Sequence, residues 1–365
     1  MITLRDKVFG SYLGAAIGDA LGGPVQGMHA QRIRQVLGGV TDMLPYRKPP
    51  GFYEPGPGYA LHGDAGCVTD ETLVRAQFAH FVTEHPHSRN LVEFVRHLLR
   101  YGDFKVWPPR MVEPLMRIKQ GQTRPEIAGA AVEPGGGLGW WTPFGIANAG
   151  RPDKANDEAT RLSALWKRPL EQDLLAAVQA GVAHALTAKA TPNSVVETAC
   201  SAVGPSARRL IQRAVTIARS VTRGDLATFT ARMYQGVLVA SAPDAVDGPI
   251  PPPAAAPQNL EEPTGSPLLA EQVPLAFAAL IFGDGRSRAT LLAAASLGRE
   301  AKAIGSAVGS LIGALVGRPR VPREWVGAVI AANHAEVDLV QQANDLADLI
   351  ESRLAEPERG VGPGM

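Results

Sequence analysis

The chain is poor in cysteine, in aromatic residues and in net charge, and each shortage argues against a class of protein. Its 365 residues include only two cysteines, Cys67 and Cys200, which are too few for a disulfide framework. Aromatic residues make up 6% of the chain, which disfavours a sandwich of aromatic-rich strands. A net charge of +1 gives no sign of a basic face for nucleic acid. We therefore expect reduced thiols and no nucleic-acid partner.

A long hydrophobic run is also missing. The longest uncharged stretch near the end, residues 303–317, has about 15 residues, whereas a membrane helix needs about 20. The opening MITLRDKVFGSYLG mixes charges and glycines where a secretory signal has an apolar core. These features predict a cytoplasmic protein without a membrane partner, and a buried helix over residues 303–317.

What the chain does contain is helix-forming sequence. Apolar residues account for 45% of it, and strand-like alternation is scarce. Thr3 and Asp6 form a T-x-x-D capping-box signal at the start of the first helical stretch. An all-α fold is predicted, with helical patterns over residues 3–22, 69–85, 90–101, 153–166, 171–187, 193–203, 205–220, 225–240, 269–282, 287–297, 301–317 and 322–354.

Two segments interrupt the helical pattern. Residues 45–66 are rich in Pro, Gly and aromatics and predict an irregular loop. Residues 241–268 are rich in proline and predict a surface insertion, because matching motifs lie on both sides of them. We expect one helical domain over residues 1–355 that contains this insertion, and a flexible tail over residues 356–365.

A glycine repeat links the two ends of the chain. In GSYLGAAIGDALG (10–22) and GSAVGSLIGALVG (305–317), glycine recurs at every fourth position. That spacing places the glycines near one helix face, where two backbones can approach closely. The repeat predicts a tight helix contact, which either serves packing alone or also frames a site near the helix ends.

Four segments, taken together, resemble the ADP-ribosylglycohydrolase family. They are GAAIGDALGGPVQG (14–27), GCVTDETL (66–73), PGGGLGWWTPFGIANAGRPDKANDEA (134–159) and GREAKA (298–303). The resemblance implies a compact orthogonal bundle of helices. In that family, acids from these motifs hold two Mg²⁺ or Mn²⁺ ions, which grip ribose hydroxyls and organise water beside a glycosidic bond.

The resemblance also implies site residues, and several of them depart from the family's pattern. The retained positions are Thr69, Asp70 and Thr72; the altered ones are Gln26 and Glu71, then Glu300, Lys302 and Ala303. Gln26 stands where the family has a glutamate, and Glu71 and Glu300 each replace an aspartate. Lys302 replaces a further aspartate and Ala303 a threonine or serine, and these two are the serious changes. The chain is therefore expected to be a divergent member with an altered metal site.

Charge limits how many ions such a site can hold. Asp70, Glu71 and Glu300 with Lys302 sum to a charge of −2, which one dication neutralises and two would exceed. We expect at most one Mg²⁺ or Mn²⁺, held by Thr69, Asp70, Glu71 and Glu300, or none. Lys302 is predicted to take the place of one ion, salt-bridged to Asp70 and Glu300.

Other residues are candidates for contacts with the substrate, and each has a structural alternative. Backbone N–H groups of Gly135, Gly136, Gly137 and Gly139 could cradle a phosphate or ribose, or simply form a turn. Trp140 could stack on a base, although it and Trp141 equally fit a core. The remaining candidates are Gln26 as a substrate contact, His29 and His62 as proton carriers, and Cys67 as a structural thiol.

Three functions fit these residues. We favour an enzyme that cleaves a glycosidic bond in a ribosyl or nucleotide-type small molecule, with Asp70, Glu71, Glu300 and Lys302 as catalytic residues. The alternative is a non-catalytic relative that binds a ribosyl ligand or a partner. A third possibility is an elimination or isomerisation run by Lys302 and Glu300. Thr69, Asp70 and Glu71 are also ordinary for a helix start, because they suit an N-cap and the helix dipole.

Overall fold

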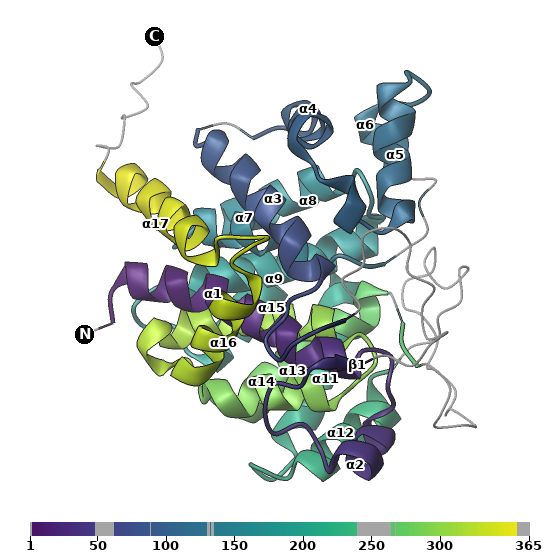
Figure 1. The fold of residues 1–365 in the computed structure, drawn as a ribbon, viewed down its shortest axis with the longest axis vertical. Coiled ribbons are helices and arrows are strands. Elements are labelled where there is room, and N and C mark those ends of the chain that lie inside the picture. The colour runs from purple at the N-terminus through teal and green to yellow at the C-terminus, as the bar shows by residue number, and fades with distance from the viewer. Residues whose placement is uncertain are drawn as a thin grey trace.

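The computed structural model describes residues 2–47, 62–87, 89–129, 132, 135–238, 264–266 and 268–355. These residues confirm the predicted all-α fold (Figure 1). Within the described ranges the strands are confined to one antiparallel ribbon, which pairs β1 (Tyr46–Arg47) with β2 (His62–Gly63). The ribbon flanks part of the segment predicted as a loop, and residues 48–61 of that segment lie outside the described residues.

Helices account for the rest of the architecture. They are α1 (Leu4–Gly22), α2 (Ala30–Leu37), α3 (Asp70–Glu84), α4 (Leu91–Tyr101), α5 (Pro109–Lys119), α6 (Pro125–Ala128), α7 (Thr142–Ala147), α8 (Pro152–Ser163), α9 (Pro169–Ala185), α10 (Pro192–Ser201), α11 (Pro205–Arg219), α12 (Leu226–Gly236), α13 (Leu269–Gly283), α14 (Ser287–Ser296), α15 (Ala301–Val316), α16 (Arg323–Asn333) and α17 (Leu339–Ala355). The predicted capping box is present, with Thr3 as the N-cap of α1 and Asp6 as its partner. No described helix combines the length and the apolar character needed to cross a membrane.

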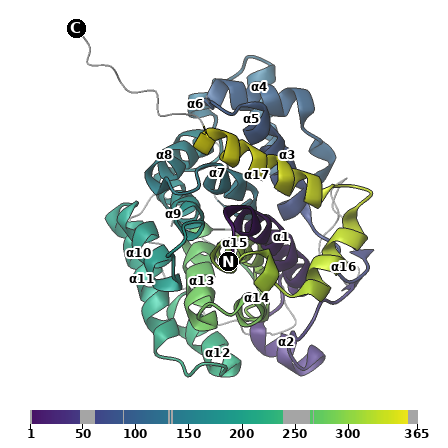
Figure 2. The same cartoon turned by 90° about the vertical axis from the view of Figure 1, so that its left-hand side faces the viewer.

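α1 and α15 lie side by side at the centre of the molecule, with other helices around them (Figures 1 and 2). Their glycines face each other: a Cβ on Gly18 would lie 1.8 Å from the Gly305 carbonyl oxygen, and one on Gly14 would lie 2.4 Å from that of Gly309. These separations are far below any real Cβ contact. The glycine repeat therefore marks a close helix contact, as predicted.

The single helix predicted over residues 322–354 is wrong. α16 ends at Asn333, whose side-chain amide donates to the Gly66 and Val329 carbonyl oxygens at 2.9 and 2.6 Å while its Oδ1 accepts from the Val68 backbone. α17 then begins beyond Asp338, whose Oδ1 accepts from the Val340 and Gln341 N–H groups. Polar side chains thus end one helix and start the next. The prediction also missed α2, α5, α6 and α7.

The Pro-rich insertion and the tail fall largely outside what the structure describes. Residues 241–263 and 267 of the predicted insertion, and all of residues 356–365, lie outside the described residues. On the two sides of the insertion, α13 packs against α9 and α11, which come before it in the sequence. Helices from both sides therefore share one hydrophobic core.

Candidate functional site

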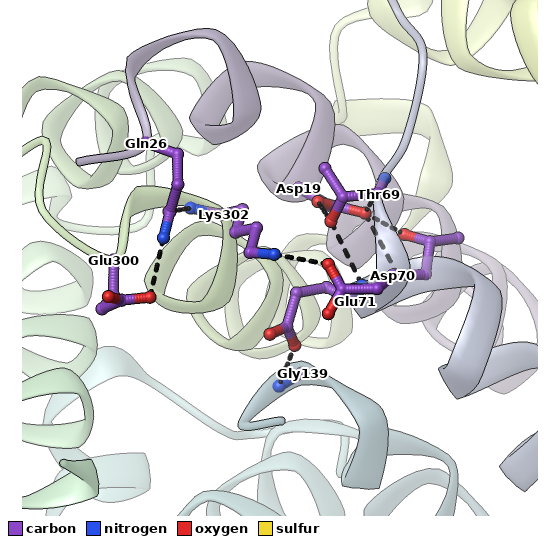
Figure 3. A network of polar contacts seen from close by, with 9 residues as sticks. Asp19, Gln26, Thr69, Asp70, Glu71, Gly139, Glu300 and Lys302 are labelled. Atoms are coloured by element: carbon purple, nitrogen blue, oxygen red, sulfur yellow. Dashed lines mark hydrogen bonds and ion pairs between the residues drawn. The ribbon is translucent and has the colours of Figure 1, made fainter. Parts of the chain in front are cut away.

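The predicted acids lie where α1, α3 and α15 meet (Figure 3). Asp70 and Glu71 occupy the first turn of α3, and Thr69 caps that helix by accepting from the Glu71 backbone N–H at 3.1 Å. The interpretation of Thr69, Asp70 and Glu71 as a capped helix start is therefore correct. Lys302 lies in the first turn of α15, two residues after Glu300, which occupies the N-cap position. The tight α1–α15 contact thus places the end of α1, with the first motif, and the start of α15, with the fourth motif, close to α3.

Lys302 forms the predicted ion pair with Asp70, while the predicted pair with Glu300 stays a prediction. Its Nζ contacts Asp70 Oδ1, and the two side chains are 16% and 5% exposed. The positive charge therefore lies directly on a carboxylate that the resemblance assigns to metal binding. An ammonium in that place supplies charge and three donors but no coordination bond.

Gln26 forms hydrogen bonds with both Glu300 and Lys302. Its Nε2 donates to Glu300 Oε2 at 2.7 Å, and its Oε1 accepts from the Lys302 backbone N–H at 3.2 Å. A glutamate here could accept from Lys302 but could not donate to Glu300. The change from the family's glutamate to Gln26 therefore allows residue 26 to donate a hydrogen bond to the Glu300 carboxylate.

Asp19 is a site residue that the sequence interpretation missed. It is fully buried and accepts four hydrogen bonds, from the backbone N–H and hydroxyl of Thr69 at 2.8 and 2.6 Å and from those of Thr72 at 3.1 and 2.7 Å. Burial raises the pKa of Asp19, although the threonine bonds oppose this. Asp19 joins α1 to the start of α3, and its presence in the GDALG motif was the available signal.

Glu71 is buried and held by the glycine-rich segment. Only 2% exposed, it accepts a hydrogen bond at Oε2 from the Gly139 N–H at 2.8 Å. Burial, with a smaller contribution from Asp70, raises the pKa of Glu71 to about 8. A Cβ at Gly139 would lie 2.4 Å from Ser306 Oγ, so this close approach requires glycine.

The raised pKa of Glu71 gives a testable dependence of stability on pH. Because the folded protein holds this proton more tightly than the unfolded chain, its contribution to stability is complete below about pH 4.5 and falls as pH rises toward about 8. We expect Glu71→Gln to remove this loss, so that the free energy of unfolding of the variant rises relative to that of the wild type between pH 5 and pH 8. Urea unfolding at both pH values measures this difference. If the free energy of unfolding changed equally with pH in both proteins, Glu71 would not titrate in this range.

The glycine loop is tied down through its carbonyl groups. Gly135, Gly136 and Gly137 all have positive φ, and the carbonyls of the first two accept from Lys167 Nζ at 2.8 and 2.6 Å. Lys167 is 3% exposed, and burial lowers its pKa to about 8. This loop is therefore braced by a buried cation, while the predicted cradle of N–H groups for a ligand stays a prediction.

The proposed stacking of Trp140 on a base is wrong in this structure. The ring is fully buried and packs against Phe78 and Trp107, with centroids 6.0 and 5.1 Å apart, so no face is open to a ligand. Trp141 is equally buried. Both tryptophans belong to the core, which was the alternative interpretation.

The two histidines and the cysteine near the motifs have mainly structural surroundings. His29 caps α2 by accepting from the Gln31 N–H at 3.1 Å, and its ring packs edge-on against Tyr234. The side chain of His62 lies outside what the structure describes. Burial raises the pKa of the Cys67 thiol, which disfavours a nucleophilic thiolate.

The four predicted metal ligands do not converge in this arrangement. Thr69 donates its hydroxyl to Asp19, while Asp70, Glu71 and Glu300 are engaged by Lys302, Gly139 and Gln26 respectively. Among the described residues, no three Asp, Glu, His or Cys side chains form a group able to hold an ion. The donor set as arranged therefore does not fit the metal pair that the resemblance implies.

Comparisons with known proteins agree with the fold. A solved structure titled "ADP-ribosylglycohydrolase-related protein complex" superimposes with a TM-score of 0.59 over 95% of this chain and 99% of that one, at 18% sequence identity. Similarity at this level shows the fold alone. No curated protein matches the chain. The model of the family described as ADP-ribosylglycohydrolase matches residues 1–358, and the chain therefore belongs to the ADP-ribosylglycohydrolase family.

Proposed function

We propose that this protein is a metal-independent glycosidase-type hydrolase that acts on a ribosyl or nucleotide-type small molecule. The observation that carries the proposal is the Lys302–Asp70 ion pair, which puts a built-in cation among the acids of the family's motifs. Family membership supports the hydrolytic reaction class. Retention of acidic side chains at Glu71 and Glu300 favours an enzyme over a decayed centre.

Each charged group has a role in the proposed reaction. Glu71 gives its proton to the leaving group as the glycosidic C–N or C–O bond breaks, and its burial supports this role by keeping it protonated near neutral pH. Glu300 accepts a proton from the water whose oxygen bonds to the anomeric carbon. Asp70 and Lys302 bind ribose hydroxyls and balance the charge that develops on the sugar.

The test is a screen of ADP-ribosyl compounds and nucleotides for release of free base or ribose, with EDTA present throughout. We expect turnover that EDTA leaves unchanged and that Glu71→Gln lowers about 10²- to 10⁴-fold, the usual contribution of a general acid. If no compound released free base or ribose, either in EDTA or in added Mn²⁺, the result would contradict a hydrolase.

A non-catalytic binder of a ribosyl ligand is the second candidate. Ala303 supports it, because this position has lost the hydroxyl that the family pattern carries beside its metal ligands. In that case ADP-ribose would bind in calorimetry without any release of product. Binding accompanied by turnover would exclude this candidate.

The role of Lys302 can be tested by counting bound metal. Lys302→Asp removes a positive charge and adds a carboxylate, so we expect the variant to bind at least one more Mn²⁺ than the metal-stripped wild type in an electron paramagnetic resonance titration. Lys154→Asp makes the same charge change on the exposed face of α8 and is the matched control. Two tight ions in the wild type, or no gain in Lys302→Asp, would contradict our placement of Lys302.

A further inference from the structure

A groove separate from the acidic site runs along the outer side of α3. Its volume is about 560 Å³, within the usual range for small-molecule sites. It is lined by α3, α4, the turn after α4, the segment between α16 and α17, and Gln342 of α17. None of the residues of the Lys302–Asp70 site borders this groove.

The groove has an apolar floor and an acidic border. The floor is formed by Leu73, Ala76, Leu98, Val106 and Val337. The charged residues among its lining are all acidic, namely Asp103, Glu336 and Asp338, and no lysine or arginine lines it in the described part of the chain. The three acids come from two separate segments, so a ligand between them would meet negative charge from both.

In the described part of the chain these carboxylates have no cationic partner. Within the residues that the structure describes, none of the three forms an ion pair. Asp103 Oδ1 accepts from the Lys105 backbone N–H, and Asp338 Oδ1 caps α17. Backbone hydrogen bonds therefore orient two of these carboxylates while leaving their charges uncompensated.

Aromatic side chains form one wall of the groove, and Arg100 lies against one of them. His97 is 5% exposed, hydrogen-bonds through Nε2 to His80, and is kept uncharged because burial lowers its pKa to about 4. Tyr101 is 51% exposed, and the Arg100 guanidinium lies over its ring at 5.1 Å, so one cation lies on the Tyr101 side of the groove, away from the acids of the other segment. The turn is held in place by Gln77, whose Oε1 accepts from the Asp103 N–H at 3.1 Å.

We propose that this groove binds an aliphatic polyamine, whose methylene chain covers the apolar floor while its protonated nitrogens meet Asp103, Glu336 and Asp338. The volume fits a small molecule, and the separation of the acids into two segments fits a ligand with more than one positive charge. A neutral or anionic ligand would leave the carboxylates uncompensated or repelled.

Calorimetric titration of the full chain with spermidine tests the proposal. We expect saturable binding to the wild type that weakens at least about tenfold, or 1.4 kcal/mol, in the triple variant D103N/E336Q/D338N. The control triple E113Q/D153N/D157N removes the same charge from exposed positions of α5 and α8, and should bind within about twofold of the wild type. Octane-1,8-diol, which has the chain without the charges, should not bind.

A single variant keeps the test valid if the triple variant does not fold. Glu336→Gln changes an exposed residue with no cap to lose, and should weaken spermidine binding by itself. Absence of saturable binding to the wild type would overturn the proposal. Equal weakening in both triple variants would also overturn it, because the attraction would then come from diffuse surface charge. Neither result bears on the hydrolase, whose residues these variants leave intact.

Discussion

Replacing Gly18 with alanine is expected to destabilise the protein by at least about 3 kcal/mol, the upper end for overpacking a well-packed core. The new Cβ would lie 1.8 Å from the Gly305 carbonyl oxygen and 2.3 Å from its carbonyl carbon. Both atoms belong to the α15 backbone, so no side chain can rotate away. The two helices must separate, and the contacts of the neighbouring glycines loosen with them. Urea unfolding of the variant measures the loss.

Gly327→Ala is the matched control for this experiment. Gly327 lies inside α16, is exposed, and would present its Cβ to no atom within 4 Å. Alanine there should stabilise the helix by up to about 1 kcal/mol, because it has the higher helix propensity. If Gly18→Ala proved as stable as Gly327→Ala, the close approach of α1 and α15 would be incorrect.

Replacing Arg299 with methionine is expected to cost about 3–5 kcal/mol, the usual cost of leaving a buried charge without its partner. Arg299 donates from Nε and Nη2 to the two carboxylate oxygens of Glu271 at 2.6 and 2.9 Å, and the Glu271 side chain is fully buried. The Arg299 backbone also exchanges hydrogen bonds with Gly27 and Met28. The same residue therefore holds the segment after Gln26 against the start of α15.

Two controls distinguish the cost of breaking the buried ion pair from the cost of losing the arginine side chain. The double variant R299M/E271L removes both charges and should recover most of the stability lost by R299M. Arg288→Met breaks a pair with Glu324 whose side chains are 45% and 60% exposed, and should cost at most about 1 kcal/mol. A cost for R299M no larger than that for R288M would mean that the Arg299–Glu271 pair is open to solvent.

Features with a strong local signature could be predicted from the sequence. Glycine at every fourth position has one main structural use in paired helices, and it led to the α1–α15 contact. Lys302 replaces an acid in one motif, and Asp70 is an acid retained in another. Their opposite charges led to the prediction of the Lys302–Asp70 pair. In both cases the residue type itself restricts what can lie beside it, so that spacing along the chain carries three-dimensional information.

Other features depend on partners that no local pattern reveals. The end of α16 depends on Asn333 bonding to Gly66, far away in sequence, and no proline or glycine marks the break. Trp140 was compatible with both a stacking surface and a core until its neighbours were known. The GDALG motif marks Asp19, but its partners lie on another helix, so they follow only from how the two helices pack.

The pairing of α1 with α15 also has a consequence for how the protein is made. α1 ends at Gly22 and its partner ends at Val316, so α1 leaves the ribosome well before α15. At about 5–20 residues per second, roughly 15–60 seconds of translation separate the two helices. Throughout that time the glycine-rich face of α1 lacks its native cover, and closing so long a loop is slow. The nascent chain therefore depends on remaining soluble, or on a chaperone, until α15 appears.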